Sequence, residues 1–384
     1  MEHPFDRVTL AELRQRRSAK WSIYPPDVLP AWVAEMDYPL ADPIRRVLSE
    51  SIERNDAGYA ARGDLGEVFA AWAKGRWGWP LEATDVQLVC DVVTGIAEIL
   101  RVATVPGDGV VIEPPVYPPF AATIRHLDRR VVEVPLVSSE NGDEATDLRA
   151  LEVAYAGGAR VHVLCSPQNP TGTVASRETL IAIADLAERY GVLVLSDEIH
   201  APLTLPGATH APYPSVSDAA RETGIVLTSA SKAWNVAGLK AAMMVATGRR
   251  PREIIARLPP DLPYHAGHLG VLAAKAAFTE GDAWLAQTIA ILDRNRALLG
   301  DLLADALPGA AYRPPRAGYL AWIDMRALGV SDDPARVILK EGRLALSPGP
   351  TFGTQGKGFV RLNIATTRAI LEDAVTRMRQ ALVR

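Results

Sequence analysis

The chain has 384 residues, of which 48% are hydrophobic and 22% charged, with a formal net charge of −4. This is the composition of an ordinary globular protein with a large core. The negative charge argues against a nucleic-acid partner, because a phosphate-binding surface normally carries a basic excess. The first residues lack the apolar core of a secretory signal, and no stretch has the roughly eighteen apolar residues of a membrane span. We therefore expect a cytoplasmic protein with no nucleic-acid and no membrane partner.

The first 45 residues read as an arm rich in proline and aromatic residues, KWSIYPPDVLPAWVAEMDYPLADPI at residues 20–44. Proline in a helix interior removes a hydrogen bond and clashes with the preceding turn. The five prolines in this stretch therefore exclude a long helix. We expect the arm to run extended over another surface of the protein.

Between about residues 85 and 245 the chain alternates short apolar runs with helical segments. Runs of this length without strict alternation are typical of parallel strands that are covered on both faces. One intervening helix has clear ends, with Ser176 as the predicted N-cap and Gly191 at its stop. The pattern predicts a doubly wound α/β domain. The apolar runs are VQLVC (86–90), VVIE (110–113), VVEV (131–134), RVHVLC (160–165), VLVLS (192–196) and IVLTS (225–229).

After about residue 280 the pattern changes to a helix, a strand, a helix, a strand and a final helix. This order predicts a smaller α+β domain. We expect an arm that belongs partly to the small domain at 1–45, a large α/β domain at 46–280 and the small domain at 281–384.

In an open parallel sheet, ligands bind beyond the carboxyl ends of the strands. A glycine turn into a helix, VVTGI, follows the first run, and its amides could receive an anion. Each residue at the other strand ends has an ordinary structural explanation by itself, such as a turn, a cap or an exposed lysine. Together an anion site, an aromatic ring, an amide, a carboxylate and an amine are what pyridoxal phosphate requires. The residues that follow the later runs are Tyr117 in PPVYPPF, Asn169 in SPQNPTG, Asp197 in SDEIH and Lys232 in SASK.

On these residues the sequence resembles the fold type I pyridoxal-phosphate enzymes of the class I/II aminotransferase superfamily. Within that group it is similar to the cystathionine β-lyase-like (C–S lyase) branch. The likeness covers nearly the whole chain, and the order of its motifs is specific for the superfamily. The motifs are WVAEMDYP, GYAARGD, VVTGI, PPVYPPF, SPQNPTG, SDEIH, SASKAWNVAGLK, GDAWL and FVRLNIATTR.

The resemblance implies a role for each residue at the cofactor. Lys232 would condense with the cofactor's aldehyde and later move the substrate α-proton, as an amine whose pKa is lowered by Lys240 and by partial burial. Asp197 would pair with the pyridine nitrogen, Asn169 would donate to the phenolic oxygen and Tyr117 would stack on the ring. The phosphate would be held by the amides of Gly95 and Ile96 and by Ser229, Ser231 and Lys240.

Further residues are implied around the substrate. Arg361 is the candidate for the α-carboxylate of an amino acid, because a guanidinium grips a carboxylate in a bidentate way, although a surface arginine on a strand is the alternative. Tyr59 matches the position that reaches the phosphate of the neighbouring subunit, which implies a homodimer with shared active sites. Tyr24 and Trp32 either wall the substrate entrance or pack as core.

Two positions depart from the aminotransferase pattern and resemble the C–S lyase branch. His200 stands where many members have tyrosine, and Lys240 stands where many have arginine. His200 either contacts the phenolic oxygen or fills space beside the strand. The histidines in PYHAGHLG (263–270) have no carboxylate or thiol at ligand spacing, so we expect no metal.

The sequence leaves three hypotheses for the activity. The first is β-elimination from cystathionine or another S-substituted cysteine, with release of thiol, pyruvate and ammonia. The second is an aminotransferase of unknown amino-acid range, and the third is a non-catalytic pyridoxal-phosphate-binding regulator. The identity of the leaving thiol and the choice between a dimer and a tetramer stay open.

Overall fold

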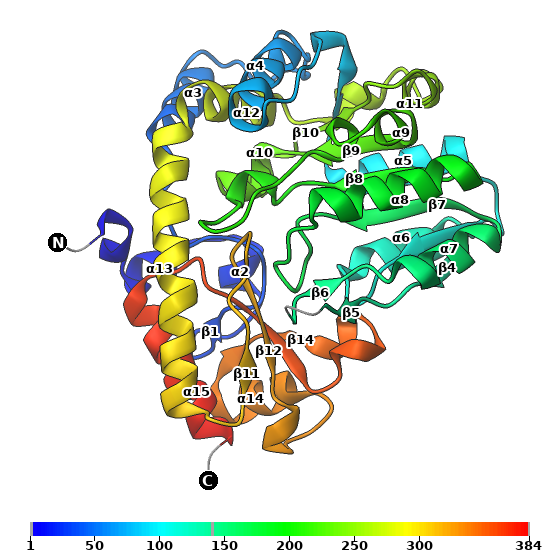
Figure 1. Ribbon diagram of the computed structural model, residues 1–384. Helices are drawn as coiled ribbons and strands as arrows, with labels where there is room; N and C mark the ends of the chain where they lie inside the picture. Colours follow the sequence, from blue (N-terminus) through cyan, green and yellow to red (C-terminus); the bar gives the residue numbers. More distant parts are fainter. Residues whose placement is uncertain (1–2, 140–141, 383–384) are drawn as a thin grey trace.

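The computed structural model describes residues 3–139 and 142–382 and contains a large seven-stranded sheet (Figure 1). The strands lie in the order β2-β10-β9-β8-β7-β3-β4, and every neighbouring pair from β9 to β4 is parallel. The prediction of a doubly wound, mostly parallel sheet is confirmed. The strands are β2 Val86–Val89, β3 Gly109–Ile112, β4 Arg130–Glu133, β7 Ala159–Cys165, β8 Leu193–Asp197, β9 Gly224–Thr228 and β10 Ala242–Val245.

Strand β10 is absent from the predicted apolar runs. It is only four residues long and lies between β2 and β9, antiparallel to both. Only Ala241 stands between its sequence AMMV and the lysine segment 229–240, so no clear turn signal separates the two. The sheet is therefore mixed at this position, and β10 returns the chain from the lysine loop.

Helices cover both faces of the large sheet. On one face α5, α6 and α11 share a hydrophobic core with Val110 and Ile112, and on the other α7, α8 and α9 share one with Val111. Successive residues of a strand point to opposite faces, so both sets must be apolar. This explains why the strands read as continuous apolar runs. The helices are α5 Val92–Ala103, α6 Pro118–His126, α7 Leu148–Ala156, α8 Arg177–Tyr190, α9 Asp218–Thr223 and α11 Arg249–Ile255.

The ends of α8 lie where the sequence places them. The Ser176 side chain accepts a hydrogen bond from the backbone N–H of Thr179 at 3.1 Å. Gly191 ends the helix with φ of 69°, a left-handed conformation that glycine adopts without the steric cost of a Cβ. Both predicted boundary residues of this helix are confirmed.

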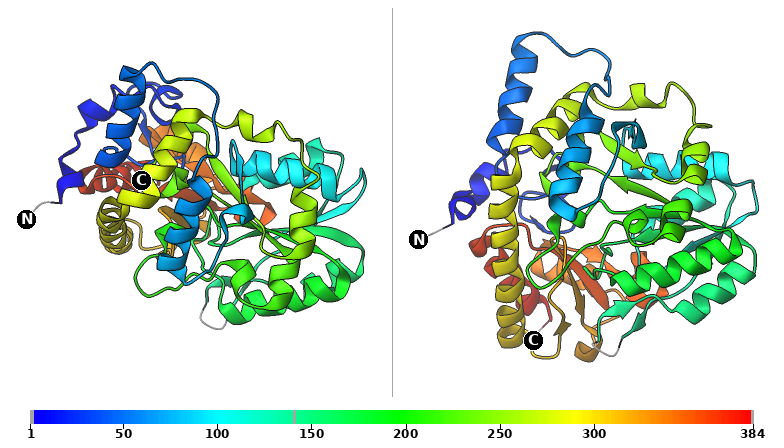
Figure 2. Two further views of the ribbon diagram at one scale, coloured as in Figure 1. Left: turned by 90° about the horizontal axis from the view of Figure 1, so that it is seen from above. Right: turned by 45° about the horizontal axis from the view of Figure 1, so that its top comes forward.

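The long helix α13, Asp282–Ala306, runs along one side of the molecule and leads to the C-terminal elements (Figures 1 and 2). These include a four-stranded antiparallel sheet in the order β11-β12-β15-β14. In the N-terminal arm, β1 pairs in parallel with β13. The elements are β1 Leu29–Pro30, β11 Ala311–Tyr312, β12 Leu320–Asp324, α14 Pro334–Gly342, β13 Leu344–Ala345, β14 Ser347–Pro348, β15 Phe359–Asn363 and α15 Arg368–Leu382.

Six further α-helices and a small hairpin make up the remaining α-helices and strands of the described residues. Helices α3 and α4 both contact α12, beside the upper end of α13 in Figure 1. Among the helices of residues 3–139 and 142–382, none has the length and apolar character that crossing a membrane requires. The remaining elements are α1 Leu10–Leu13, α2 Ala19–Ser22, α3 Asp42–Glu53, α4 Leu65–Trp77, β5 Val137–Ser138, β6 Glu144–Ala145, α10 Ala230–Ala233 and α12 His268–Glu280.

Candidate active site

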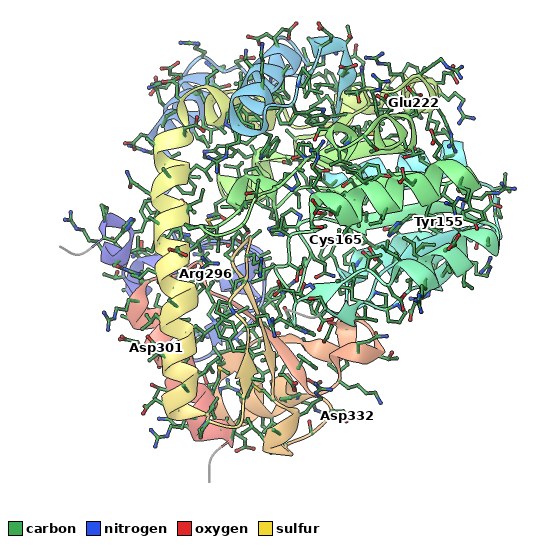
Figure 3. All side chains as sticks on the ribbon, in the orientation of Figure 1. Tyr155, Cys165, Glu222, Arg296, Asp301 and Asp332 are labelled. Atoms are coloured by element: carbon green, nitrogen blue, oxygen red, sulfur yellow. The ribbon has the colours of Figure 1, made fainter. Side chains whose placement is uncertain are left out.

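The carboxyl ends of β7, β8 and β9 face the middle of the molecule. In Figure 3, Cys165 at the end of β7 lies near the centre of the molecule, whereas Tyr155 on α7 lies toward its right-hand edge. A cavity of about 460 Å³ opens at these strand ends. Eight of the predicted site residues line it, namely Tyr117, Asn169, Asp197, His200, Ser231, Lys232, Lys240 and Arg361.

Lys232 lies in the short helix α10, which begins directly after β9. Its Nζ donates a hydrogen bond to the carbonyl oxygen of Ala34 at 3.2 Å. Burial, and then the positive charge of Arg361, lowers the pKa of the amine from 10.5 to about 8, against the opposing charge of Asp197. Lys240 also lowers this pKa but contributes less than Arg361, so the main neighbouring cation is Arg361 rather than the expected Lys240.

Asp197 ends β8 and is 5% exposed. Its Oδ1 accepts the backbone N–H of Ile199 at 3.1 Å, while burial raises the pKa of the carboxyl to about 7. A cation placed against a buried carboxylate stabilises the charged form and reverses such a shift. The protonated nitrogen of a pyridine ring is such a cation.

Arg361 on β15 is buried, so its alternative interpretation as a surface arginine is wrong. Its Nη1 donates to Asn169 Oδ1 at 2.9 Å, and its Nη2 donates to the Trp32 carbonyl at 2.9 Å and to Ser347 Oγ at 3.0 Å. The guanidinium also lies 4.9 Å from the ring centre of Phe352. Because the Asn169 oxygen accepts from Arg361, the Nδ2 group of the amide remains available to donate.

The start of α5 forms another wall of the cavity. Asp91 is the N-cap of this helix, and its Oδ1 accepts the backbone N–H of Thr94 at 2.8 Å. Its Oδ2 lies 3.0 Å from Nζ of Lys240, whose own backbone is left-handed with φ of 57°. The cavity therefore brings a helix start and a lysine together, as a phosphate site requires. Asp91 and Thr94 were not among the predicted site residues.

The predicted amides of Gly95 and Ile96 do not line this cavity. The N–H of Gly95 donates to the Asp91 carbonyl at 3.0 Å, because position 95 already lies one turn inside the helix. A Cβ at Gly95 would lie 2.8 Å from the Leu227 side chain, so this glycine permits close packing of α5 on the sheet. Ile96 is fully buried in the same packing. The amides at the helix start are those of residues 92–94.

The two predicted serines have different surroundings. Ser229 is the N-cap of α10, and its hydroxyl accepts the N–H of Ser231 at 3.0 Å and donates to the carbonyl of Ala241 at 2.7 Å. These bonds join α10 to the start of β10. Ser231 lines the cavity, whereas Ser229 does not belong to its lining.

His200 is buried at the cavity wall, with its ring 5.9 Å from that of Tyr319 at an angle of 69°. Burial, and then the charge of Lys232, lowers the pKa of the imidazole to about 3. Its Nδ1 has no hydrogen-bond partner among the described residues. The imidazole is therefore neutral at physiological pH.

Three of the predicted site residues, all aromatic, lie outside the cavity lining. The rings of Tyr24 and Trp32 contact each other at 6.0 Å, and the Trp32 backbone reaches the site through its carbonyl on Arg361. Tyr59 is 87% exposed and packs against the ring of Tyr264 on the surface. The three side chains are therefore not brought to the cavity within one chain.

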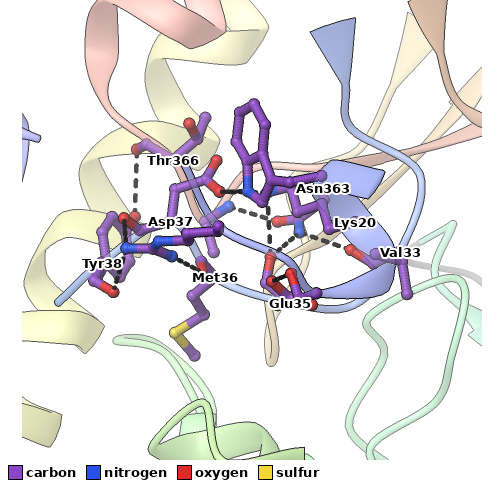
Figure 4. Close-up of polar contacts among 12 residues, drawn as sticks. Lys20, Val33, Glu35, Met36, Asp37, Tyr38, Asn363 and Thr366 are labelled. Atoms are coloured by element: carbon purple, nitrogen blue, oxygen red, sulfur yellow. Dashed lines mark hydrogen bonds and ion pairs between the residues drawn. The ribbon is translucent and has the colours of Figure 1, made fainter. Parts of the chain in front are cut away.

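The segment 33–38 of the arm carries the carbonyl that contacts Lys232, and a polar network fixes it (Figure 4). Lys20 and Asp37 form an ion pair at 2.8 Å in which both side chains are 1% exposed. Asn363 Nδ2 donates to the carbonyls of Val33 and Glu35 at 2.8 and 2.6 Å. Sequence motifs could not reveal this network, because its members lie up to 330 positions apart.

The fold and this cavity define the class of protein, and the similarity of this chain to known proteins agrees with it. The family model "Aminotransferase class I and II" matches residues 26–378, and the chain belongs to this family. Enzymes of this family depend on pyridoxal phosphate, which the amine, the carboxyl and the helix start of the cavity fit. The predicted superfamily and fold class are confirmed.

Several relatives with known names share one activity in those names. The chain is 44% identical over 408 residues to the "Putative cystathionine beta-lyase" of Mycobacterium tuberculosis (strain ATCC 25618 / H37Rv), covering 99% of this chain and 98% of that protein. It is 33% identical to the cystathionine beta-lyase PatB of Bacillus subtilis (strain 168), with 93% of each chain covered. A crystal structure titled "putative plp-dependent beta-cystathionase" from Corynebacterium diphtheriae matches with a TM-score of 0.93 at 34% identity, covering 100% of this chain and 99% of that one. The predicted C–S lyase branch is confirmed.

Proposed function

We propose that this chain is a pyridoxal-phosphate-dependent carbon–sulfur β-lyase. Its substrate would be cystathionine or a related S-substituted L-cysteine, which with one water gives a thiol, pyruvate and ammonia. Relatives of 33% to 44% identity that bear the cystathionine beta-lyase name support this activity. The observation that carries the proposal is the amine of Lys232, with a lowered pKa, in one cavity with Arg361 and Asp197.

The residues of the cavity divide the task of holding the cofactor. Asp197 would pair with the ring nitrogen, and Tyr117 would pack on the ring from the start of α6. Asn169 would donate to the phenolic oxygen through its free Nδ2, and Lys240 with the start of α5 would hold the phosphate. His200, as a neutral imidazole, would lie beside the ring. When bound, pyridoxal phosphate supplies an electron sink that stabilises negative charge at the substrate α-carbon.

The protein groups then provide binding and proton transfer. Arg361 would bind the substrate carboxylate, which fixes the orientation of the bonds around the α-carbon. Lys232 would take the α-proton, since a pKa of about 8 leaves an appreciable fraction of the amine neutral near physiological pH. The electron pair left on the α-carbon would form the double bond to the β-carbon as the C–S bond breaks. The thiolate would leave with the electron pair of the C–S bond and take up a proton.

The product balance tests this proposal. The purified enzyme is incubated with L-cystathionine or S-methyl-L-cysteine without any keto acid, and thiol, pyruvate and ammonia are measured. A lyase releases the three in equal amounts. Strict dependence on added keto acid would exclude the lyase and favour an aminotransferase, the second candidate, whose name the family model bears. Cofactor binding without turnover on any amino acid would favour the non-catalytic regulator.

The proposal includes a homodimer with shared active sites in the cytoplasm. It is supported by the exposed pair of Tyr59 and Tyr264, 87% and 60% exposed, which offers an apolar surface for a second copy. In the dimer Tyr59 would reach the phosphate of the partner subunit. Sedimentation of the wild type tests whether the protein is a dimer. The Tyr59→Ala variant tests the contact with the partner's phosphate, because it should retain the cofactor more weakly than the wild type.

We also propose residues 46–280 and 281–384 as the large and small domains, with 1–45 as an arm partly in the small domain.

A further inference from the structure

We propose that Asp91 is an internal anion that competes with the cofactor's phosphate for Lys240 and for the start of α5. This inference rests on the proposed function, because it concerns the phosphate end of the same cavity. It adds a residue that limits the affinity for phosphorylated ligands. Asp91 thereby sets the affinity of the site for the cofactor.

The carboxylate of Asp91 uses the two groups that a phosphate would use. Oδ1 accepts the N–H of Thr94 at 2.8 Å, which is one of the free donors at the helix start. Oδ2 pairs with Nζ of Lys240 at 3.0 Å. The side chain is 34% exposed and belongs to the cavity wall, so it is not locked into the core. A phosphate at this end of the cavity would therefore meet both donors already in use.

The charges at this position oppose a second anion. Burial opposes the ionisation of Asp91, but the N–H of Thr94 and the ammonium of Lys240 outweigh it and lower its pKa. The charge of Asp91 thus offsets the positive charge of Lys240, which then attracts the incoming phosphate dianion less strongly. Like charges within a few ångströms repel, and the repulsion is strongest where water is partly excluded. Phosphate binding must therefore displace Lys240 from Asp91 or tolerate the carboxylate beside it.

Removing the charge of Asp91 should strengthen the binding of phosphorylated ligands selectively. Asp91→Asn keeps a side-chain oxygen for the N–H of Thr94 and removes the negative charge. Asp91→Ser keeps a capping oxygen in a smaller side chain and protects the test if the first variant folds poorly. A matched control is Asp147→Asn. Asp147 caps α7 through the N–H groups of Arg149 and Ala150 at 3.0 and 3.1 Å and is not part of the cavity wall.

The experiment is equilibrium dialysis of the full-length protein after its bound cofactor has been removed. Protein is dialysed against a series of fixed concentrations of pyridoxal phosphate, or of pyridoxal without phosphate, and bound ligand is measured by absorbance. We expect Asp91→Asn and Asp91→Ser to bind pyridoxal phosphate about tenfold more tightly than the wild type. Pyridoxal affinity should change by less than twofold, and Asp147→Asn should match the wild type with both ligands.

Each other outcome overturns the inference. Weaker binding of pyridoxal phosphate by both Asp91 variants would show that Asp91 orients Lys240 for the phosphate. Unchanged binding, or an equal change for pyridoxal and pyridoxal phosphate, would show that the carboxylate does not compete. The dialysis contains no amino-acid substrate, so it separates this inference from the lyase activity. A wild type that bound no pyridoxal phosphate would contradict the proposed function itself.

Discussion

The amine of Lys232 donates a hydrogen bond of 3.2 Å to the carbonyl of Ala34, a residue 198 positions away in the sequence. The same carbonyl accepts the hydroxyl of Tyr319 at 3.1 Å. A segment of the N-terminal arm thus forms part of the site around the lysine. The arm is therefore part of the candidate active site and not only a cover for the sheet.

The buried ion pair between Lys20 and Asp37, which holds segment 33–38 of the arm, should stabilise the folded protein. Lys20→Met leaves the carboxylate of Asp37 buried beside fewer partners, and such a loss costs roughly 3–5 kcal/mol. The exposed pair of Arg45 and Asp42, whose side chains are 67% and 84% exposed, is the control. Arg45→Met should change the free energy of unfolding by about 1 kcal/mol or less. Urea denaturation of both variants measures the difference, and equal effects would contradict the role of the buried pair.

Arg361 should determine affinity for the amino-acid carboxylate. Arg361→Lys keeps a positive charge but loses the planar pair of donors, so we expect KM for the substrate to rise by about tenfold or more. Ser347→Ala removes one acceptor of Arg361 and leaves the guanidinium in place, so its effect should be smaller. Steady-state kinetics of both variants provides the measurement. An unchanged KM in Arg361→Lys would remove this residue from the substrate site.

Asp197 should make the cofactor-free protein less stable as the pH rises. Burial raises its pKa to about 7 from an ordinary value of 3.8, so the folded state binds the proton more tightly than the unfolded state. The stabilisation of the folded state by this tightly bound proton is complete below pH 4 and is lost as the pH rises through about 7. Asp197→Asn should therefore gain stability relative to the wild type between pH 4 and 8. A stability difference that is independent of pH in this range would be inconsistent with the buried carboxyl.

His200 should not titrate in the physiological range. Its pKa of about 3 predicts that the imidazole is neutral throughout pH 5–8. The pH profiles of kcat/KM for the wild type and for His200→Gln should then have the same inflections, even if their heights differ. If an inflection near pH 6 in the wild type disappeared in the variant, His200 would act as an acid or base.

The strand ends could be predicted from sequence because local signals mark them. Asp197, Asn169 and Lys232 each follow a buried apolar run, and parallel strands bring their carboxyl ends to one edge. The position of the helix start was harder to predict. The glycine at 95 suggested an anion-binding turn, but it lies one turn inside α5, where the neighbouring Leu227 requires a residue without a Cβ.

The contacts between distant segments could not be predicted in this way. Ala34 contributes only a backbone carbonyl, so its side chain gives no signal in the sequence. Asp91 does give a signal in the sequence, because aspartate is a preferred N-cap and marks the start of a helix. Its pairing with Lys240, 149 positions later, depends on the packing of β10 beside β2. Burial around Lys232 and Arg361, which sets their pKa values, likewise depends on the tertiary structure.

Borohydride reduction followed by peptide mapping tests the central claim most directly. The account predicts that reduction of the yellow holoenzyme fixes one pyridoxyl group per chain on Lys232, and that Lys232→Ala fixes none at the site. Modification of a different side chain, or protein that stays colourless with excess pyridoxal phosphate, would contradict the assignment of this cavity.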